Sequence, residues 1–207
     1  MGIISGLVRH SGGLFRVFRA FLDIFVTNEF KQKVRCKGDA DLRWPLYLIG
    51  GKFITVGDKF RSEPGFRCEC LDHYSGKQYS PQLIIGNHVS FGYCCHIGCV
   101  EYIYIGNYVL FGSNILITDH NHGRFIHEDK DVPWIYRDLY VKGSVHIEDN
   151  VWIGDNTIIM SGVTIGKGSV IGANSVVTHD IPSYSMAVGC PARIIKSLEI
   201  IPANNEI

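Results

Sequence analysis

The sequence predicts an all-β solenoid built from stacked six-residue repeats, with a helical segment before it and an extended loop within it. Three observations predict this architecture. Aliphatic or Phe residues recur at every sixth position over most of the chain. Glycine often follows them directly, and 23 glycines in 207 residues exceed the usual frequency of about 7%. The period is interrupted before residue 141, which leaves room for a loop at about 119–140.

Residues 1–45 precede the repeats and are expected to form an apolar helical segment. From Ser11 onward the apolar residues have helical spacing. One face contains Leu14, Phe15, Phe18, Phe21, Leu22 and Phe25, and another contains Arg16, Arg19, Asp23 and Thr27. The segment has no run of about 20 uncharged residues and no basic region before its first apolar residues, so neither a spanning helix nor a secretory signal is expected. Residues 1–30 either pack on the rest of the protein or lie on a membrane surface, with Arg at the headgroups and Phe below.

The repeats are expected to occupy residues 46–195. An α-helix has no reason to mark every sixth residue, so each hexad is interpreted as a short strand followed by a corner, with its apolar anchor pointing inward. The glycine allows a tight corner, where a Cβ would clash or φ would be positive. Three hexads close one triangular turn, and the turns bury a core by stacking. The anchors are Ile85, Phe91, Ile97, Ile105, Phe111, Ile117, Val141, Ile147, Ile153, Ile159, Ile165, Ile171 and Val177.

Three departures from the period are predicted to leave the coil. The stretch from Leu71 to Gln82 is rich in turn residues, and the step from Ile97 to Ile105 is two residues too long, which predicts a bulge at a corner. The third departure is the loop at 119–140, which begins with the residues DHNHG. A loop that leaves a rigid scaffold is a common place for function. Residues 196–207 are expected to form a C-terminal tail.

The composition excludes some function classes. Lys plus Arg equals Asp plus Glu at 20 each, so the chain has no strongly basic face for a nucleic-acid partner. The seven cysteines are odd in number and irregularly spaced, which is typical of a reducing compartment. We therefore expect a cytoplasmic protein, peripheral at the inner face of the cytoplasmic membrane if the N-terminal helix is interfacial.

The repeat pattern over about residues 50–195 resembles the hexapeptide-repeat acyltransferases. The resemblance, and not the spacing, implies that the coil is a left-handed parallel β-helix. The N-terminal stretch SGGLFRVFRAFLDIFVTNEF and the loop DHNHG resemble the O-antigen and lipopolysaccharide O-acetyltransferases. This resemblance implies acetyl-CoA as the acetyl donor, no metal, a sugar or oligosaccharide acceptor, and a homotrimer with active sites between subunits.

His122 and His120 are the candidate catalytic residues. A neutral imidazole is suited to removing a hydroxyl proton near pH 7. The maltose and galactoside acetyltransferases place such a histidine five residues after the last anchor before the loop, which is His122 in this sequence. His120 is the second candidate, a support for the acceptor sugar, or a residue without chemical role. Glu128, Asp119 and a backbone carbonyl all remain open as the group that orients His122.

The C-terminal coils resemble the acetyl-CoA-binding coils of the same family. By position, this resemblance implies that Asp155 and Ala173 contact the pantetheine arm through their backbone and that the amide of Asp155 donates to the thioester oxygen as it becomes an oxyanion. Trp152 is expected to form a wall of this site.

Thr178, His179 and Arg193 fall where the family contacts the phosphates of CoA. The family usually has Lys in the place of His179, and an imidazole carries less positive charge at pH 7. Arg193 retains a guanidinium group, which binds phosphate well.

The predicted function is O-acetyl transfer to a sugar hydroxyl of a bacterial surface polysaccharide or of its lipid-linked precursor. The galactoside enzymes use an Asn where this chain has FGYCCHIG, so free galactose or maltose is not the expected acceptor, and Tyr93 or His96 is a candidate substitute. The alternatives are an antibiotic O-acetyltransferase, a non-catalytic scaffold, and a zinc protein similar to the gamma-class carbonic anhydrases. The last would use His88, His120 and His122 as ligands.

Overall fold

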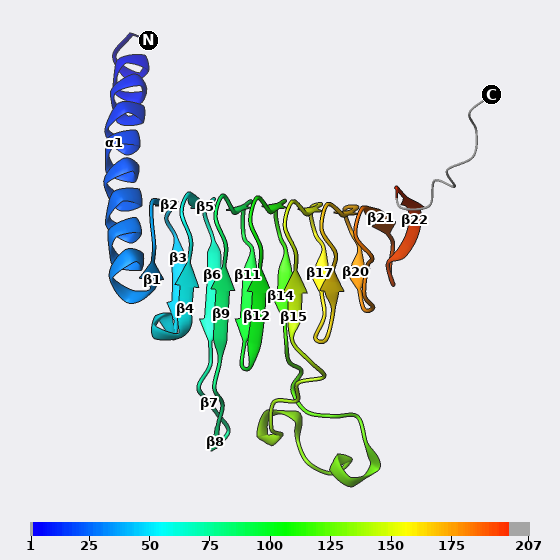
Figure 1. Ribbon diagram of the computed structural model, residues 1–207. Coiled ribbons are helices and arrows are strands. Elements are labelled where there is room, and N and C mark those ends of the chain that lie inside the picture. The colour runs from blue at the N-terminus through cyan, green and yellow to red at the C-terminus, as the bar shows by residue number, and fades with distance from the viewer. Residues whose placement is uncertain (1, 199–207) are drawn as a thin grey trace, which may run out of the picture.

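The computed structural model describes residues 2–198, with side chains described for residues 15–198. This part of the chain is a parallel β-helix with three flat sides, in which consecutive strands alternate among three sheets that run along one axis (Figure 1). Sheet A contains β1 (Arg35–Cys36), β4 (Ile54–Val56), β9 (Gln82–Ile85), β12 (Tyr102–Ile105), β15 (Val145–Ile147) and β18 (Thr164–Ile165). Sheet B contains β2 (Ala40–Leu42), β5 (Phe60–Ser62), β10 (Ser90–Phe91), β13 (Leu110–Phe111), β16 (Trp152–Ile153), β19 (Val170–Ile171), β21 (Ser185–Val188) and β22 (Arg193–Ser197). Sheet C contains β3 (Leu46–Ile49), β6 (Phe66–Cys70), β11 (His96–Cys99), β14 (Leu116–Thr118), β17 (Ile158–Ile159) and β20 (Val176–Val177).

The predicted anchors form the core. Ile147 pairs with Ile165, and Ile153 pairs with Ile171, so anchors of neighbouring coils stack directly on one another. Every anchor is buried except Val141, which is half-buried at the end of the loop. The residue four positions after the anchor is small or branched and buried as well, except after Ile97 and Ile117, where the period breaks and Glu101 and Asn121 are exposed. The expected inward column is therefore confirmed.

The corner glycines are required by close approach rather than by their own backbone angles. A Cβ on Gly86 would lie 2.6 Å from the carbonyl oxygen of Gly106 in the next coil. Positive φ falls instead on the third residue after the anchor, as at Asn114, Asn156 and Asn174. Asn tolerates this left-handed conformation better than most residues, which explains why these corners need no second glycine.

Helix α1 (Gly2–Lys33) covers the N-terminal end of the solenoid, and its first half extends beyond the coils (Figure 1). Asp23 accepts hydrogen bonds from the backbone of Trp44 at 2.8 Å and from the Arg43 side chain at 3.2 Å, while Val26 and Phe30 are buried. The packed face is thus the one that carries Asp23.

The Phe-rich face of α1 does not pack on the coils. Phe15, Phe18, Phe21 and Phe25 are each more than half exposed. Leu14 and residues 1–12 of the predicted apolar segment lie outside the described side chains. Within residues 2–198, no helix is both long and apolar enough to cross a membrane.

The departures from the period emerge at one corner, between sheets C and A. The turn-rich stretch forms a hairpin of β7 (His73–Tyr74) and β8 (Lys77–Gln78), and the loop at 119–140 contains two short 3-10 helices, η2 (His127–Asp129) and η3 (Trp134–Tyr136). Figure 1 shows both hanging from the same side of the solenoid. A third 3-10 helix, η1 (Gly51–Phe53), lies at the same corner of an earlier coil.

The ends of the coil differ slightly from the predicted segment boundaries. Strands β1 and β2 join sheets A and B before residue 46. Strand β22 turns back antiparallel to β21 and extends to Ser197, and residues 199–207 of the predicted tail lie outside the described chain.

Candidate active site

The corner between sheets C and A contains a cavity of about 450 Å³, within the usual range for small-molecule sites. Strands β6, β11 and β14 end at it, and the hairpin and the loop stand over it. Both candidate histidines contribute to its wall. Its lining residues are Arg67, Glu69, Leu71, Tyr74, His96, Gly98, Leu116, Thr118, His120, Asn121 and His122.

Asp119 organises this corner from a fully buried position. Its carboxylate accepts backbone hydrogen bonds from Val100 at 3.0 Å, Glu101 at 2.9 Å and Tyr102 at 3.0 Å. These donors form the bulge that the long step after Ile97 predicts. Asp119 therefore supports the preceding coil instead of bonding the backbone of its own loop.

The same carboxylate orients His120. Nδ1 of His120 lies 3.0 Å from Oδ1 of Asp119, and the imidazole is largely buried. Because a carboxylate only accepts hydrogen bonds, this contact assigns the ring proton to Nδ1 and leaves a lone pair on Nε2. A neutral imidazole in this tautomer, beside a cavity, is a geometry suited to a general base.

His122 stands further out and is exposed. Its Nδ1 lies 3.1 Å from the hydroxyl of Tyr74, which belongs to the hairpin. A phenol can donate or accept, so this contact does not fix the tautomer of His122. The ring centroids of the two histidines are 6.3 Å apart, which allows both to touch one small ligand.

A second carboxylate–histidine pair lines the cavity. Glu69 accepts hydrogen bonds from Arg67 at 2.9 Å and from Nε2 of His96 at 2.9 Å. Burial alone would raise the pKa of Glu69, but the hydrogen bonds from Arg67 and His96 outweigh it and lower the pKa below its ordinary range. The pKa of His96 is lowered, first by burial. At neutral pH the pair is therefore a carboxylate bonded by a neutral imidazole.

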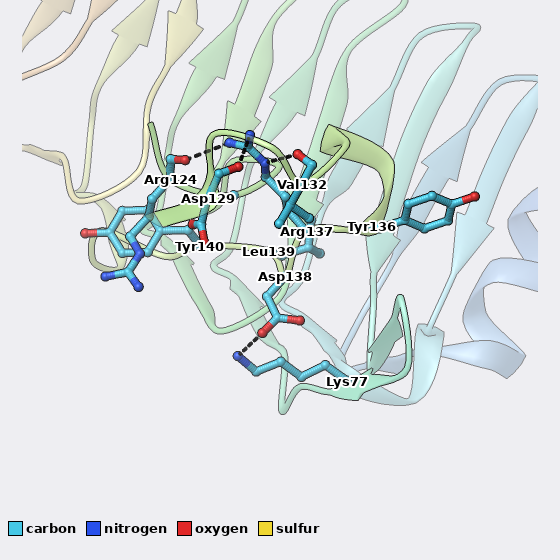
Figure 2. Close-up of a pocket in the computed structure, with 10 residues that line it drawn as sticks. Lys77, Arg124, Asp129, Val132, Tyr136, Arg137, Asp138, Leu139 and Tyr140 are labelled. Carbon is cyan, nitrogen blue, oxygen red and sulfur yellow. Dashed lines mark hydrogen bonds and ion pairs between the residues drawn. The ribbon is translucent and has the colours of Figure 1, made fainter. Parts of the chain in front are cut away.

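The loop above the cavity is held by one arginine. The guanidinium of Arg137 donates to the carbonyl oxygens of Val132 at 2.8 Å, Arg124 at 2.9 Å and Asp129 at 2.6 Å, as Figure 2 shows. It also stacks on the ring of Trp134. Arg137 is itself buried, so it ties the loop into a compact unit around a second cavity of about 370 Å³.

The loop and the hairpin are joined to each other. Lys77 pairs with Asp138 at 3.1 Å (Figure 2), and the hydroxyl of Tyr79 accepts from the backbone of Leu139 at 2.8 Å. These contacts link residues about 60 positions apart in sequence. They place Tyr74 against His122.

The residues predicted to bind the pantetheine arm lie elsewhere. Trp152 is exposed on β16 of sheet B. Asp155 and Ala173 are exposed at the corner between sheets B and C on neighbouring coils, and Asp155 accepts from the backbone of Ser113 at 2.7 Å. In the register of the sheets Asp155 aligns with Ser113, seven residues before His120, so roughly 20 Å of chain separates this corner from the histidines across sheet C.

The residues predicted to bind the CoA phosphates are also divided. Thr178 and His179 follow β20, two coils beyond the histidines at the same corner, and are hydrogen-bonded to each other at 2.8 Å. Arg193 is exposed on β22. Within a single copy of the chain, the histidines and Thr178 therefore share one corner, but the other residues predicted to bind CoA do not all lie there.

The zinc ligands of the alternative interpretation are not assembled. His88 lies at the corner between sheets A and B, where it stacks on Tyr108. No cluster of three or more His, Cys, Asp or Glu side chains suited to a metal ion occurs in the described range.

Sequence reasoning missed Tyr74, Arg67, Glu69 and Gly98 at the cavity. Arg67 and Glu69 alternate along β6 with buried neighbours, so they face outward beside the corner. The sequence signal that could have identified them is a pair of charged residues at outward positions next to a break in the six-residue period. Tyr74 had none, because its place depends on the fold of the hairpin.

The comparisons with known proteins identify the family. The sequence profile described as "Bacterial transferase hexapeptide (six repeats)" matches residues 144–179. A protein of Escherichia coli (strain K12), whose name describes a lipopolysaccharide biosynthesis O-acetyl transferase (WbbJ), is 33% identical over 188 residues and 89% of each chain. The chain belongs to the bacterial hexapeptide-repeat transferase family. The predicted resemblance to lipopolysaccharide O-acetyltransferases is confirmed.

Solved structures of acyltransferases have the same fold. An N-acyltransferase from Bacillus cereus, AntD, in complex with dTDP and 3-hydroxybutyryl-CoA, has a TM-score of 0.65 at 20% identity over 81% of this chain and 85% of its own. A maltose O-acetyltransferase from Clostridium difficile 630 has a TM-score of 0.54 at 28% identity, over 81% of this chain and 72% of its own. A hexapeptide-repeat acetyltransferase from Vibrio cholerae, VCA0836, has a TM-score of 0.54 at 25% identity, over 96% of this chain and 94% of its own. The left-handed parallel β-helix and the class of acyltransferase are therefore confirmed, while the individual site residues stay predictions.

Proposed function

We propose that the protein transfers the acetyl group of acetyl-CoA to a sugar hydroxyl of a bacterial surface polysaccharide, such as O-antigen or lipopolysaccharide, or of its lipid-linked precursor. The relative at 33% identity supports the substrate class. The observation that carries the proposal is the Asp119–His120 pair, because it presents an oriented imidazole to a cavity of suitable size.

The reaction is a direct transfer. The acceptor hydroxyl enters the cavity and gives its proton to an imidazole nitrogen as its oxygen attacks the thioester carbon. A backbone N–H donor stabilises the oxyanion that forms. The C–S bond then breaks, and the imidazolium returns the proton to the leaving thiolate, which gives an acetyl ester and free CoA. No metal and no acyl-enzyme take part.

The choice of base depends on two different arguments. The spacing of the family predicts His122, whereas the hydrogen bonds favour His120, because only His120 has a carboxylate that fixes its Nε2 as an acceptor. We assign His120 as the base. His122, with Tyr74 behind it, then contacts the acceptor from the loop side.

The donor arm is proposed to follow the outer face of sheet C toward the C-terminus. Beyond the histidines this face carries half-buried apolar side chains and ends near Thr178. These side chains are Leu116, Ile158, Met160 and Val176. Within one copy of the chain, the corner that carries Asp155 and Ala173 lies away from the histidines. We therefore propose a homotrimer, in which the groove between two copies brings this corner of one copy beside the histidine corner of the next.

Helix α1 supports a lipid-linked acceptor. Its exposed Phe18, Phe21 and Phe25 form an apolar face at the N-terminal end of the solenoid. An interfacial helix there would hold the enzyme at the inner face of the cytoplasmic membrane. Replacing Phe21 with Asp is expected to reduce binding to anionic liposomes, and Ala20→Asp is the matched charge control, because Ala20 is exposed on another side of the same helix. Equal binding of both variants and the parent would contradict membrane attachment through this face.

The function is tested by CoA release from acetyl-CoA with lipid-linked or deacylated O-antigen oligosaccharide. The parent, His120→Ala and His122→Ala are compared after each is shown to be folded. We expect His120→Ala to lose activity by about 10²- to 10⁴-fold, the usual contribution of a general base. If only His122→Ala is inactive, the spacing argument is right and the tautomer argument is wrong. A parent that transfers acetyl to no sugar contradicts the proposed function.

A further inference from the structure

The wall of the cavity opposite the loop is formed by Arg67, Glu69 and His96. In the register of sheet C, Arg67 lies beside His96 and Glu69 beside Gly98, so the Glu69 carboxylate reaches His96 diagonally across two strands. The carboxylate is bonded at both oxygens, since the guanidinium of Arg67 also approaches the second oxygen at 2.8 Å. The Glu69 side chain is almost buried, but the cavity reaches it.

This carboxylate can accept a further hydrogen bond. An ionised carboxylate has about four acceptor positions, and the contacts from Arg67 and His96 occupy three of them. The guanidinium and imidazole also fix the position of the acid, which limits the loss of side-chain entropy when a ligand binds. A fixed acceptor that faces a cavity is suited to a hydroxyl donor.

Gly98 lies between this pair and the proposed base, and its lack of a side chain lets His120 come close to the pair. A Cβ on Gly98 would lie 3.2 Å from Cε1 of His120 and 3.9 Å from Nε2 of His96. A ligand atom above Gly98 therefore contacts both the His120 ring and the His96–Glu69 pair. The two carboxylate–histidine pairs face one common position.

The polarity of sheet C distinguishes the two sides of that position. Toward the C-terminus the outer face is apolar, as described for the donor arm. Toward the N-terminus it carries Arg67, Glu69 and His96, and beyond them Tyr47, whose ring lies under the Arg67 guanidinium. A polyhydroxylated ligand matches the second side, and that side also faces helix α1 (Figure 1).

We propose that Glu69, held by Arg67 and His96, binds the hydroxyl next to the one that is acetylated on a pyranose acceptor. Gly98 lets His120 approach this pair, so that one sugar ring in the cavity contacts both. This inference rests on the proposed function, because it needs a sugar to be the acceptor. It defines the acceptor as a pyranose with two adjacent free hydroxyls, one facing His120 and one facing Glu69.

The test uses the full chain, acetyl-CoA and a panel of methyl pyranosides together with their mono-deoxy analogues. Glu69→Gln keeps the shape of the side chain and removes its charge, and Glu63→Gln is the matched control, since Glu63 is exposed and does not line the cavity. We expect Glu69→Gln to lower kcat/KM for the acceptor by at least about 10-fold, as for a lost hydrogen bond to a charged group. The KM for acetyl-CoA stays near the parent value, and Glu63→Gln behaves like the parent.

The deoxy analogues make the test specific. If Glu69 binds the adjacent hydroxyl, the parent and Glu69→Gln use the analogue that lacks it equally poorly. If Glu69→Gln does not fold, the parent alone is tested, and it must use the analogue that lacks only the adjacent hydroxyl at least about 10-fold less well than the diol, whereas equal use of the two overturns the inference. Normal acceptor kinetics of a folded Glu69→Gln, with activity still dependent on a histidine, overturns the inference and leaves the proposed function intact. No transfer by the parent to any pyranoside overturns both.

Discussion

Replacing Asp119 with asparagine tests the link between the corner and the chemistry, because it changes charge with almost no change in shape. In the parent, three backbone N–H groups and Nδ1–H of His120 all point at the carboxylate. Asparagine offers one neutral oxygen and one NH₂ group in the same space. The variant must therefore lose part of this network.

The cost can be worked from the contacts. The asparagine oxygen can serve the N–H groups of Glu101 and Tyr102, each bond being weaker by about 1 kcal/mol without the charge. The N–H of Val100 lies 3.0 Å from Oδ1 and 3.1 Å from Oδ2, so it loses one of two acceptors and faces the NH₂ group, at a further cost of about 1–3 kcal/mol. The expected loss in free energy of unfolding is roughly 3–5 kcal/mol, which corresponds to about 10 °C in Tm for a chain of this length.

The effect on catalysis follows from the tautomer. The NH₂ group must donate to Nδ1 of His120, which moves the ring proton to Nε2 and removes the lone pair that accepts the hydroxyl proton. In serine proteases the same change of aspartate to asparagine lowers kcat by about 10⁴ through the wrong tautomer. We expect kcat to fall by about 10²- to 10⁴-fold here, with unchanged KM for acetyl-CoA.

The assay combines denaturant unfolding with steady-state CoA release. Asp149→Asn is the control, because the Asp149 carboxylate also accepts from the backbone of a preceding coil, at Asn107, but contacts no histidine. The control should lose some stability and keep kcat. A folded Asp119→Asn enzyme with the kcat of the parent would refute the reasoning about the tautomer, and unchanged stability would refute the reasoning about the bulge.

Three further predictions concern the loop, pH and the donor. Arg137→Lys cannot reproduce the three-way contact to carbonyl oxygens, so we expect faster tryptic cleavage within 119–140, whereas the exposed Arg124→Lys should leave the cleavage rate unchanged. The folded pKa of His96 lies below its ordinary value of 6.5, so the stability it contributes is present above that pH and lost as pH falls. In urea unfolding, the free energy of unfolding should fall less between neutral and mildly acidic pH in His96→Gln than in the parent. An equal fall in both proteins would exclude His96 as the cause. His179→Lys adds charge at the proposed phosphate end and should lower the KM for acetyl-CoA roughly twofold to fivefold at low salt, with less effect at high salt. If the KM for acetyl-CoA changes neither with salt nor in His179→Lys, His179 does not contact the donor.

The sequence predicted the coil well because its signal is local and repeated. Each anchor marks its own strand, and a period of six survives even where one position fails, as at the half-buried Val141. The loop was predicted because it removes anchors from the period. The helix was predicted too, but its packed face was not, because Asp23 and Thr27 pack through hydrogen bonds to the first coil while the Phe residues remain exposed.

The site was harder to predict because its contacts cross from one coil to another. Asp119 bonds a bulge about 18 residues earlier, and His96 bonds Glu69 27 residues earlier. A sequence pattern marks which residues face outward, but not which outward residues of neighbouring coils meet. Tyr74 and His122 meet only because the hairpin and the loop fold against each other.

The position of the site follows from the departures from the repeat. In a regular coil the backbone N–H groups bond to the next coil, so a corner has few free donors and no deep cavity. At the corner between sheets C and A, the hairpin, the bulge and the loop leave three consecutive coils, and the bulge leaves N–H groups without strand partners. Asp119 satisfies these groups, and the need to neutralise them explains how a fully buried carboxylate is tolerated beside His120. The Asp119 carboxylate that accepts hydrogen bonds from the bulge is thus also the group that orients the His120 imidazole. The proposed chemistry at this corner therefore depends on the same irregularity of the coil that opens the cavity.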